Sequence, residues 1–95
     1  MIIRPEAEAD LVNVRDWYER QREGLGAAFL LCVEEVFDRI DRTPEISAMV
    51  YQDVRRAFTR RFPYAVYYRI ADNDVVVLGI FHTRRDPREW QSRMG

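Results

Sequence analysis

The chain has 95 residues, 47% of them hydrophobic, and a formal net charge of −1 at neutral pH. This length predicts one domain over residues 1–95, and no apolar run approaches the roughly 20 residues of a membrane span. The single Cys32 excludes an internal disulfide and a cysteine-based metal cluster, and Met1–Pro5 is too short for a signal peptide. We therefore expect a cytoplasmic protein that uses no metal or cofactor and contacts no membrane.

The small net charge hides an uneven distribution along the chain. Residues 1–53 hold 12 acidic residues and 6 arginines, a net charge of −6, whereas residues 54–95 hold 4 acidic residues and 9 arginines, a net charge of +5. All 15 basic residues are arginine, whose guanidinium suits phosphate and carboxylate groups. This pattern indicates an anionic partner for the second half. Compositional bias towards arginine and ordinary surface chemistry are the alternative explanations.

A short strand and a helix are predicted first. Ile2 and Ile3 suit an edge strand that closes at Pro5, before a helix from Glu6 to about Arg22. This stretch lacks internal Pro and Gly, and its apolar residues fall at helical spacing: Leu11, Val14, Trp17 and Tyr18. We expect the large Trp17 side chain to lie in the core.

A second helix follows after the turn at Gly24–Gly26. It runs from about Gly26 to Arg42 and ends at Thr43-Pro44, because the residue before a proline disfavours the helical conformation. Its apolar stripe comprises Phe29, Val33, Val36, Phe37 and Ile40. Two helices joined by so short a connection form an antiparallel hairpin.

The second half alternates polar and apolar residues with a period of two. This pattern predicts strands over residues 54–61 and 64–71, with a short irregular strand at Met49–Tyr51 before them. A turn at Asp72–Asp74 leads into an apolar strand, Val75–Phe81, covered on both faces. Asp86-Pro87 then reads as the cap and first residue of a short terminal helix.

The order of these elements predicts an α+β domain, with the helical hairpin on one face of the sheet. The other face is expected to stay open and to present arginine and tyrosine side chains. Residues at the strand ends are expected to converge in space: Arg60, Arg61, Arg69, His82, Arg84 and Arg85. Converging guanidiniums neutralise a phosphodiester, a histidine moves a proton near neutral pH, and tyrosines stack on bases. That chemistry suits RNA cleavage with the 2′-hydroxyl as nucleophile.

Plainer interpretations of the same residues remain open. His82 follows a strand and suits a hydrogen bond to backbone, and Arg84 and Arg85 suit ion pairs with acids of the helical hairpin. Tyr64, Tyr67 and Tyr68 suit packing against the sheet. The sequence contains no phosphate-binding glycine loop, zinc-ligand spacing, nucleophile elbow or dinucleotide fingerprint.

Three segments together resemble a known family. They are the helical hairpin ending in Thr43-Pro44, a block that begins Val54-Arg55-Arg56 and ends Arg60-Arg61-Phe62-Pro63-Tyr64-Ala65-Val66-Tyr67-Tyr68-Arg69, and the block Val77-Leu78-Gly79-Ile80-Phe81-His82-Thr83-Arg84-Arg85-Asp86-Pro87. Over essentially its whole length the chain resembles the RelE/ParE superfamily, toxins of type II toxin–antitoxin (plasmid stabilisation) systems. The resemblance implies a helical hairpin on one face of a small, curved, mainly antiparallel sheet, and a cognate antitoxin that binds the toxin.

The resemblance also implies two alternative modes of growth arrest. RelE-like members cleave mRNA on the ribosome without a metal, and in that case Arg60, Arg61, His82 and Arg84 are the catalytic candidates. ParE-like members inhibit DNA gyrase and do not cleave RNA. The absence of lysine, and Thr83 in place of a tyrosine after the histidine, favour the ParE-like mode. A non-toxic interaction module is the third alternative.

Six further residues are predicted to contact the target or the antitoxin. They are Arg56, Tyr64, Tyr68, Arg69, Arg85 and Trp90.

Overall fold

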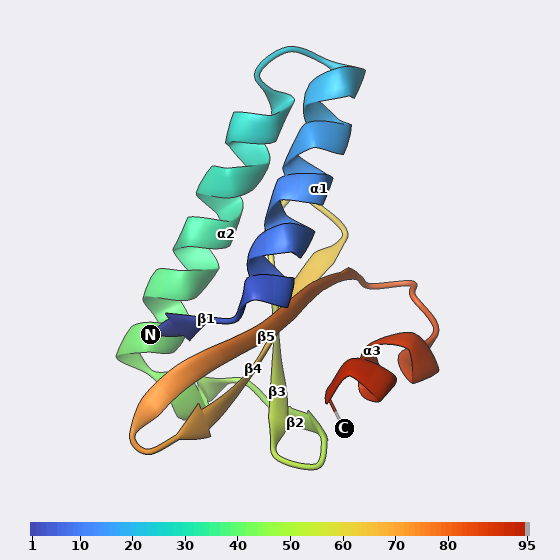
Figure 1. Ribbon diagram of the computed structural model, residues 1–95. Helices are drawn as coiled ribbons and strands as arrows, with labels where there is room; N and C mark the ends of the chain where they lie inside the picture. The colour runs from blue at the N-terminus through green and yellow to red at the C-terminus, as the bar shows by residue number, and fades with distance from the viewer. Residues whose placement is uncertain (95) are drawn as a thin grey trace.

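The computed structural model describes residues 1–94 and consists of a helical hairpin, a five-stranded sheet and a C-terminal helix (Figure 1). The elements in chain order are β1 (Ile2–Ile3), α1 (Pro5–Gln21), α2 (Leu25–Arg42), a 3₁₀ turn η1 (Pro44–Ile46), β2 (Met49–Tyr51), β3 (Val54–Phe58), β4 (Tyr64–Ala71), β5 (Asp74–His82) and α3 (Pro87–Met94). Within the described residues, no helix combines the length and apolar composition needed to cross a bilayer.

The sheet has the strand order β1-β5-β4-β3-β2. Its pairs are antiparallel except for β1, which lies parallel to β5 at one edge. The α+β class, the helical hairpin and the edge strand at Ile2–Ile3 are confirmed. Between β4 and β5, Tyr67 pairs with Gly79 and Tyr68 with Val77, so Leu78 is a bulge residue. Such a bulge locally bends the strand.

The helical hairpin covers one face of the sheet. Four residues of its apolar stripe on α2 are buried as predicted, namely Phe29, Val33, Val36 and Ile40, whereas Phe37 is only partly buried. The Phe29 ring lies 5.5 Å from the Tyr18 ring and 5.4 Å from the Phe62 ring, so this core ends in an aromatic cluster. Trp17, predicted to lie in the core, is instead 50% exposed. Its ring packs edge-to-face on Tyr18 at 5.1 Å and faces a hollow at the end of the sheet rather than the core.

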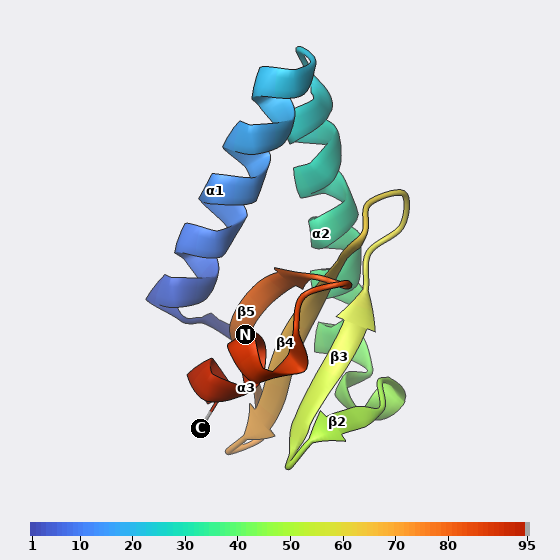
Figure 2. The same ribbon diagram turned by 90° about the vertical axis from the view of Figure 1, so that its right-hand side faces the viewer.

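The opposite face of the sheet is covered by α3, and the prediction that it stays open is wrong. Figure 2 shows α3 on the far side of the sheet from the hairpin. Trp90 and Met94, four residues apart on α3, are buried against this face together with Tyr67 and Phe81. The predicted cap is present, since the Asp86 carboxylate accepts a hydrogen bond of 2.9 Å from the Arg88 backbone N–H.

The strand predicted over residues 54–61 ends early, at Phe58. The hydroxyl of Thr59 lies 2.9 Å from the Phe62 carbonyl oxygen and 3.0 Å from that of Tyr64, which closes a tight turn. Arg61 sits in this turn with a positive φ of 68°. A residue in that conformation cannot continue a strand, so Arg60 and Arg61 belong to a loop.

The carboxylate of Asp10 joins three elements of the fold. One oxygen accepts hydrogen bonds from the backbone N–H of Ile80 on β5, at 3.0 Å, and from the guanidinium of Arg93 on α3, at 2.5 Å. Arg93 reaches Asp10 across the ring of Phe81, with its guanidinium carbon 4.5 Å from the ring centroid. A Cβ atom on Gly79 would lie 2.6 Å from that ring and 3.0 Å from Arg93. Any larger residue at this position would therefore collide with the ring and the guanidinium.

Replacing Asp10 should destabilise the fold far more than replacing another acid of the same helix. In Asp10→Ala, the Ile80 N–H and the Arg93 guanidinium lose their acceptor, and we expect unfolding in urea to become easier by about 1–3 kcal/mol. The matched control is Asp16→Ala, because Asp16 pairs only with its exposed neighbour Arg15. Its effect should stay within about 0.5 kcal/mol, and equal losses in both variants would contradict the assigned role of Asp10.

Candidate functional site

Four of the predicted site residues lie together at one end of the sheet. Tyr64 on β4 pairs with His82 on β5, and their rings are 5.2 Å apart in an edge-to-face arrangement. The turn after β5 carries Arg84 and Arg85, and the Thr83 N–H holds it to the Pro63 carbonyl at 2.8 Å. Of the six residues predicted to converge, three lie at this end of the sheet: His82, Arg84 and Arg85.

The imidazole of His82 is already engaged by backbone. Its Nδ1 accepts a 3.0 Å hydrogen bond from the Arg84 N–H, so the neutral ring carries its proton on Nε2. This contact agrees with the interpretation of His82 as a turn cap. Only Nε2 remains for a partner or a substrate.

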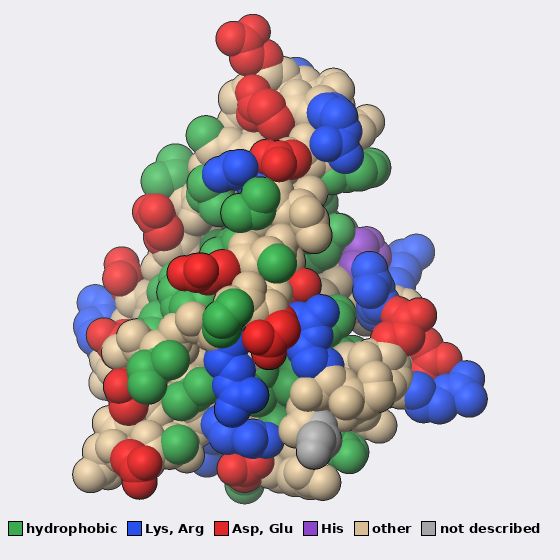
Figure 3. Space-filling model, viewed as in Figure 1, with side chains coloured by type: hydrophobic (Ala, Val, Ile, Leu, Met, Phe, Trp, Pro, Cys, Tyr) green, Lys and Arg blue, Asp and Glu red, His purple; other side chains and the backbone are tan. Residues whose placement is uncertain are grey.

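Two adjoining hollows form a groove between α1 and the end of β5, here called the α1–β5 groove. The first, of about 420 Å³, is lined by Trp17, Tyr18, Pro63, Tyr64 and His82. The second, of about 210 Å³, is lined by Asp10, Asn13, Val14, Tyr64, Ile80, Phe81, His82, Arg85 and Arg93. The two hollows share Tyr64 and His82, so they form one continuous surface. Figure 3 shows the histidine in a concave part of the outline, between the hairpin and a cluster of arginine side chains.

One face of α1 forms the whole helical wall of this groove. The five α1 residues that line it have the i, i+3, i+4, i+7, i+8 spacing of neighbours on a helix: Asp10, Asn13, Val14, Trp17 and Tyr18. The wall changes in character along its length, from carboxylate and amide near β1 to aromatic rings towards the hairpin tip. The groove therefore has a polar end and an aromatic end.

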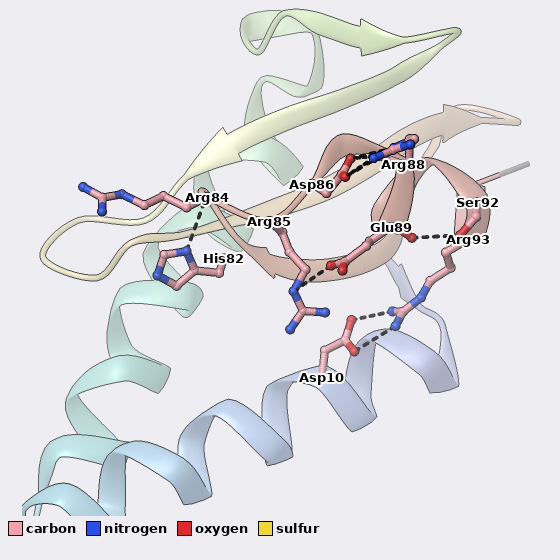
Figure 4. A network of polar contacts seen from close by, with 9 residues as sticks. All are labelled: Asp10, His82, Arg84, Arg85, Asp86, Arg88, Glu89, Ser92 and Arg93. Carbon is pink, nitrogen blue, oxygen red and sulfur yellow. Dashed lines mark hydrogen bonds and ion pairs between the residues drawn. The ribbon is translucent and has the colours of Figure 1, made fainter.

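Arginines from the C-terminal segment define the electrostatics of the polar end. In Figure 4, Arg85 and Arg93 extend towards α1, whereas Arg84 points away from Arg85. The Nε of Arg85 lies 3.2 Å from a carboxylate oxygen of Glu89, on α3 rather than on the helical hairpin. Burial raises the pKa of the Tyr64 hydroxyl, and the positive charge of Arg85 partly opposes this rise. Tyr64 is thus a neutral hydrogen-bonding group at physiological pH.

Two predicted site residues lie away from the groove. Arg60 lines a separate hollow of about 280 Å³ together with residues of α2: Glu35, Asp38, Arg39 and Arg42. Arg69 pairs with Val76, five residues along β4 from Tyr64, which is roughly 17 Å. Its Nε lies 3.4 Å from the Asp53 carboxylate. The prediction that all these arginines meet on one surface is wrong for Arg60 and Arg69.

The remaining predicted residues occupy varied environments. Arg61 lies over the Phe62 ring at 5.5 Å, and Arg56 lies over the ring of half-exposed Phe58 at 4.9 Å. Tyr68 is fully buried, and its hydroxyl donates a 2.6 Å hydrogen bond to the Pro44 carbonyl. Trp90 is also buried, at 4% exposed. Neither of these two aromatic side chains offers surface to a partner in this structure.

Several groove residues were not identified from the sequence. Trp17 was assigned to the core, and Asp10, Asn13 and Arg93 were not among the site candidates. One signal was present, because Asp10 lies four residues before Val14 and so places a charge on the apolar stripe of the helix. Within residues 1–94, no three His, Cys, Asp or Glu side chains gather closely enough to hold a metal ion.

Two comparisons with known proteins gave a match, one to a family model and one to a solved structure. Residues 1–87 match a family model described as ParE toxin of type II toxin-antitoxin system, parDE. Among solved structures, a similar chain is titled "Chromosomal ParDE TA system from P. aeruginosa"; it is 18% identical, with 86% of this chain and 95% of that chain covered and a TM-score of 0.63. No curated protein sequence matches significantly. At 18% identity the structural match supports the fold alone.

Removing the positive charge beside Tyr64 should raise the pKa of its hydroxyl further. Arg85 favours the tyrosinate, so in Arg85→Ala only the effect of burial remains and ionisation should need a higher pH. Titration by NMR of the labelled tyrosine ring carbons measures this directly. The control is Arg88→Ala, because Arg88 pairs with Asp86. A Tyr64 pKa that is unchanged or lower in Arg85→Ala would disprove the proximity of these two groups.

Proposed function

Because the chain belongs to the ParE toxin family of type II toxin–antitoxin systems, we propose that it arrests bacterial growth when free and is neutralised by a cognate antitoxin. The family match over residues 1–87 carries this proposal. The α1–β5 groove supports it, since it exposes an aromatic and basic surface on a chain whose other sheet face is covered by α3. The antitoxin and the target of such a toxin lie in the cytoplasm, which is the localisation that we propose.

For the target we favour DNA gyrase. The residues that RNA cleavage would require are divided between two surfaces, because Arg60 lines the α2 hollow while His82 lines the groove. The His82 Nδ1 is occupied by the Arg84 N–H, which leaves one ring nitrogen for proton transfer. Efficient general acid–base catalysis needs its groups within hydrogen-bond reach of one substrate atom. This separation supports a toxin that acts by binding rather than by cleavage.

Ribosome-dependent mRNA cleavage is the second candidate. The observation in its favour is the cluster of Tyr64, His82 and Arg85, which places a hydroxyl, an imidazole and a guanidinium at one end of the sheet. Such a set suits proton transfer and charge stabilisation at a phosphodiester. In that case Arg61 and Arg84, in the adjoining loops, would complete the site.

Expression of the chain alone should stop bacterial growth, and co-expression with the product of the neighbouring gene should restore it. Colony counts after induction measure both effects. A culture that grows normally, with no complex between the two proteins, would contradict the proposed function. Normal growth together with a stable complex would instead identify a non-toxic interaction module.

Purified protein should inhibit supercoiling by DNA gyrase and leave ribosome-bound mRNA intact. The substitutions His82→Ala and Arg61→Ala distinguish the two mechanisms. If the chain is a nuclease, each should reduce cleavage by about 10²-fold, because each removes a group that acts on the developing charge or the proton. Cleavage of mRNA by the wild type, lost in these variants, would replace gyrase with the ribosome as the target. Arg20→Ala, on the exposed side of α1, is the control.

A further inference from the structure

We propose that the α1–β5 groove binds two side chains of a single acidic antitoxin segment: a carboxylate at its polar end and an apolar side chain at its aromatic end. This inference rests on the proposed function, because it specifies how the antitoxin is recognised. It assigns recognition roles to Trp17, Arg85 and Arg93.

The polar end has unused hydrogen-bond donors on two guanidiniums. Arg93 donates one N–H from each terminal nitrogen to Asp10, which leaves three of its five N–H groups without a partner in the described part of the chain. Arg85 approaches Glu89 only through its Nε, and both of these side chains are more than half exposed. A pair so exposed contributes little and is easily exchanged.

The balance of charge at the polar end favours an anion. Arg85 and Arg93 line this hollow, whereas Asp10 is its one acidic lining residue. The Asp10 carboxylate is already satisfied by Ile80 and Arg93. An incoming carboxylate therefore finds two guanidiniums with free donors, and charge-assisted hydrogen bonds of this kind are among the stronger polar contacts.

The aromatic end has the features of an apolar anchor pocket. Trp17 is 50% exposed, although the ring of the adjacent Tyr18 packs edge-to-face against it at 5.1 Å. Pro63 and Tyr64 form the opposite wall of the hollow. Partly exposed aromatic side chains in a concave pocket are typical centres of protein interfaces. A leucine-sized or aromatic side chain of the partner would cover Trp17.

The distance between the two ends defines the partner segment. Asp10 and Trp17 are seven residues apart on α1, so the two subsites are separated by roughly 10 Å. One helical segment spans this distance with side chains at i and i+7, and one extended segment spans it with side chains at i and i+3. A single short stretch of polypeptide therefore reaches both subsites.

Binding of the full-length antitoxin to the intact chain tests the proposal. We expect Trp17→Ala and Arg85→Gln each to weaken binding by about tenfold or more in isothermal titration calorimetry. Two matched controls should change it by less than about twofold. Leu31→Ala removes an apolar side chain that is 63% exposed on α2, and Arg88→Gln removes an arginine that pairs with Asp86.

The salt dependence of binding provides a second measurement. Wild-type affinity should fall as salt increases, and Arg85→Gln should flatten that dependence because it removes one ion pair from the interface. Trp17→Ala should weaken binding without altering the salt dependence. If Trp17→Ala does not fold, judged by circular dichroism, Trp17→Gln tests the same subsite with a bulkier replacement.

The outcomes separate this inference from the proposed function. Wild-type protein that does not bind the antitoxin would overturn both. Tight wild-type binding that Trp17→Ala and Arg85→Gln leave within about twofold would overturn the two-subsite inference alone. Preferential binding of RNA over the antitoxin, abolished by Arg85→Gln, would also overturn it, because the groove would then recognise phosphate.

Discussion

The carboxylate of Asp10 is the contact on which the arrangement of the molecule depends. It binds residues 70 and 83 positions away in the chain, and so joins the first helix to the central part of β5 and to the last turn of α3. This contact links α1 directly to α3, although the two helices lie against opposite faces of the sheet. Asp10 also lines the α1–β5 groove, so the residue that supports the fold borders the candidate site.

Two features allow this contact to form. Gly79 presents no side chain where Arg93 crosses β5, and the Phe81 ring supports the guanidinium at 4.5 Å. Stacking of a guanidinium on an aromatic ring stabilises an arginine that is only partly hydrated. With α3 held in this way, Trp90 is buried against the face of the sheet opposite the helical hairpin. With both faces of the sheet covered, the α1–β5 groove lies at the end of the sheet.

The α1–β5 groove combines contributions from both halves of the chain. The acidic first half supplies α1, with a carboxylate at one end and aromatic rings at the other, and the arginine-rich second half supplies the opposing basic side chains. Part of the charge difference between the two halves is offset within the molecule, because Arg93 forms an ion pair with Asp10. The remaining donors of Arg85 and Arg93 support the proposal that this groove binds an acidic segment of the antitoxin.

Sequence periodicity by itself determined the elements and the class of fold. The spacing of apolar residues on α2, the proline after Thr43, the alternation along β4 and the Asp86-Pro87 cap each depend on local backbone preferences, and each was predicted correctly. The family resemblance followed from the same local blocks and was confirmed by the match over residues 1–87.

Only the tertiary structure decided which of the predicted residues reach the surface and meet. Alternation along a strand places Tyr68 and Arg69 on opposite faces, but it does not show that Tyr68 is buried or that Arg69 lies far from His82. In the same way, a helical stripe includes Trp17 without showing how far the sheet extends beneath it. These outcomes depend on contacts between residues distant in sequence, above all the pairing of Arg93 with Asp10, which no local pattern encodes.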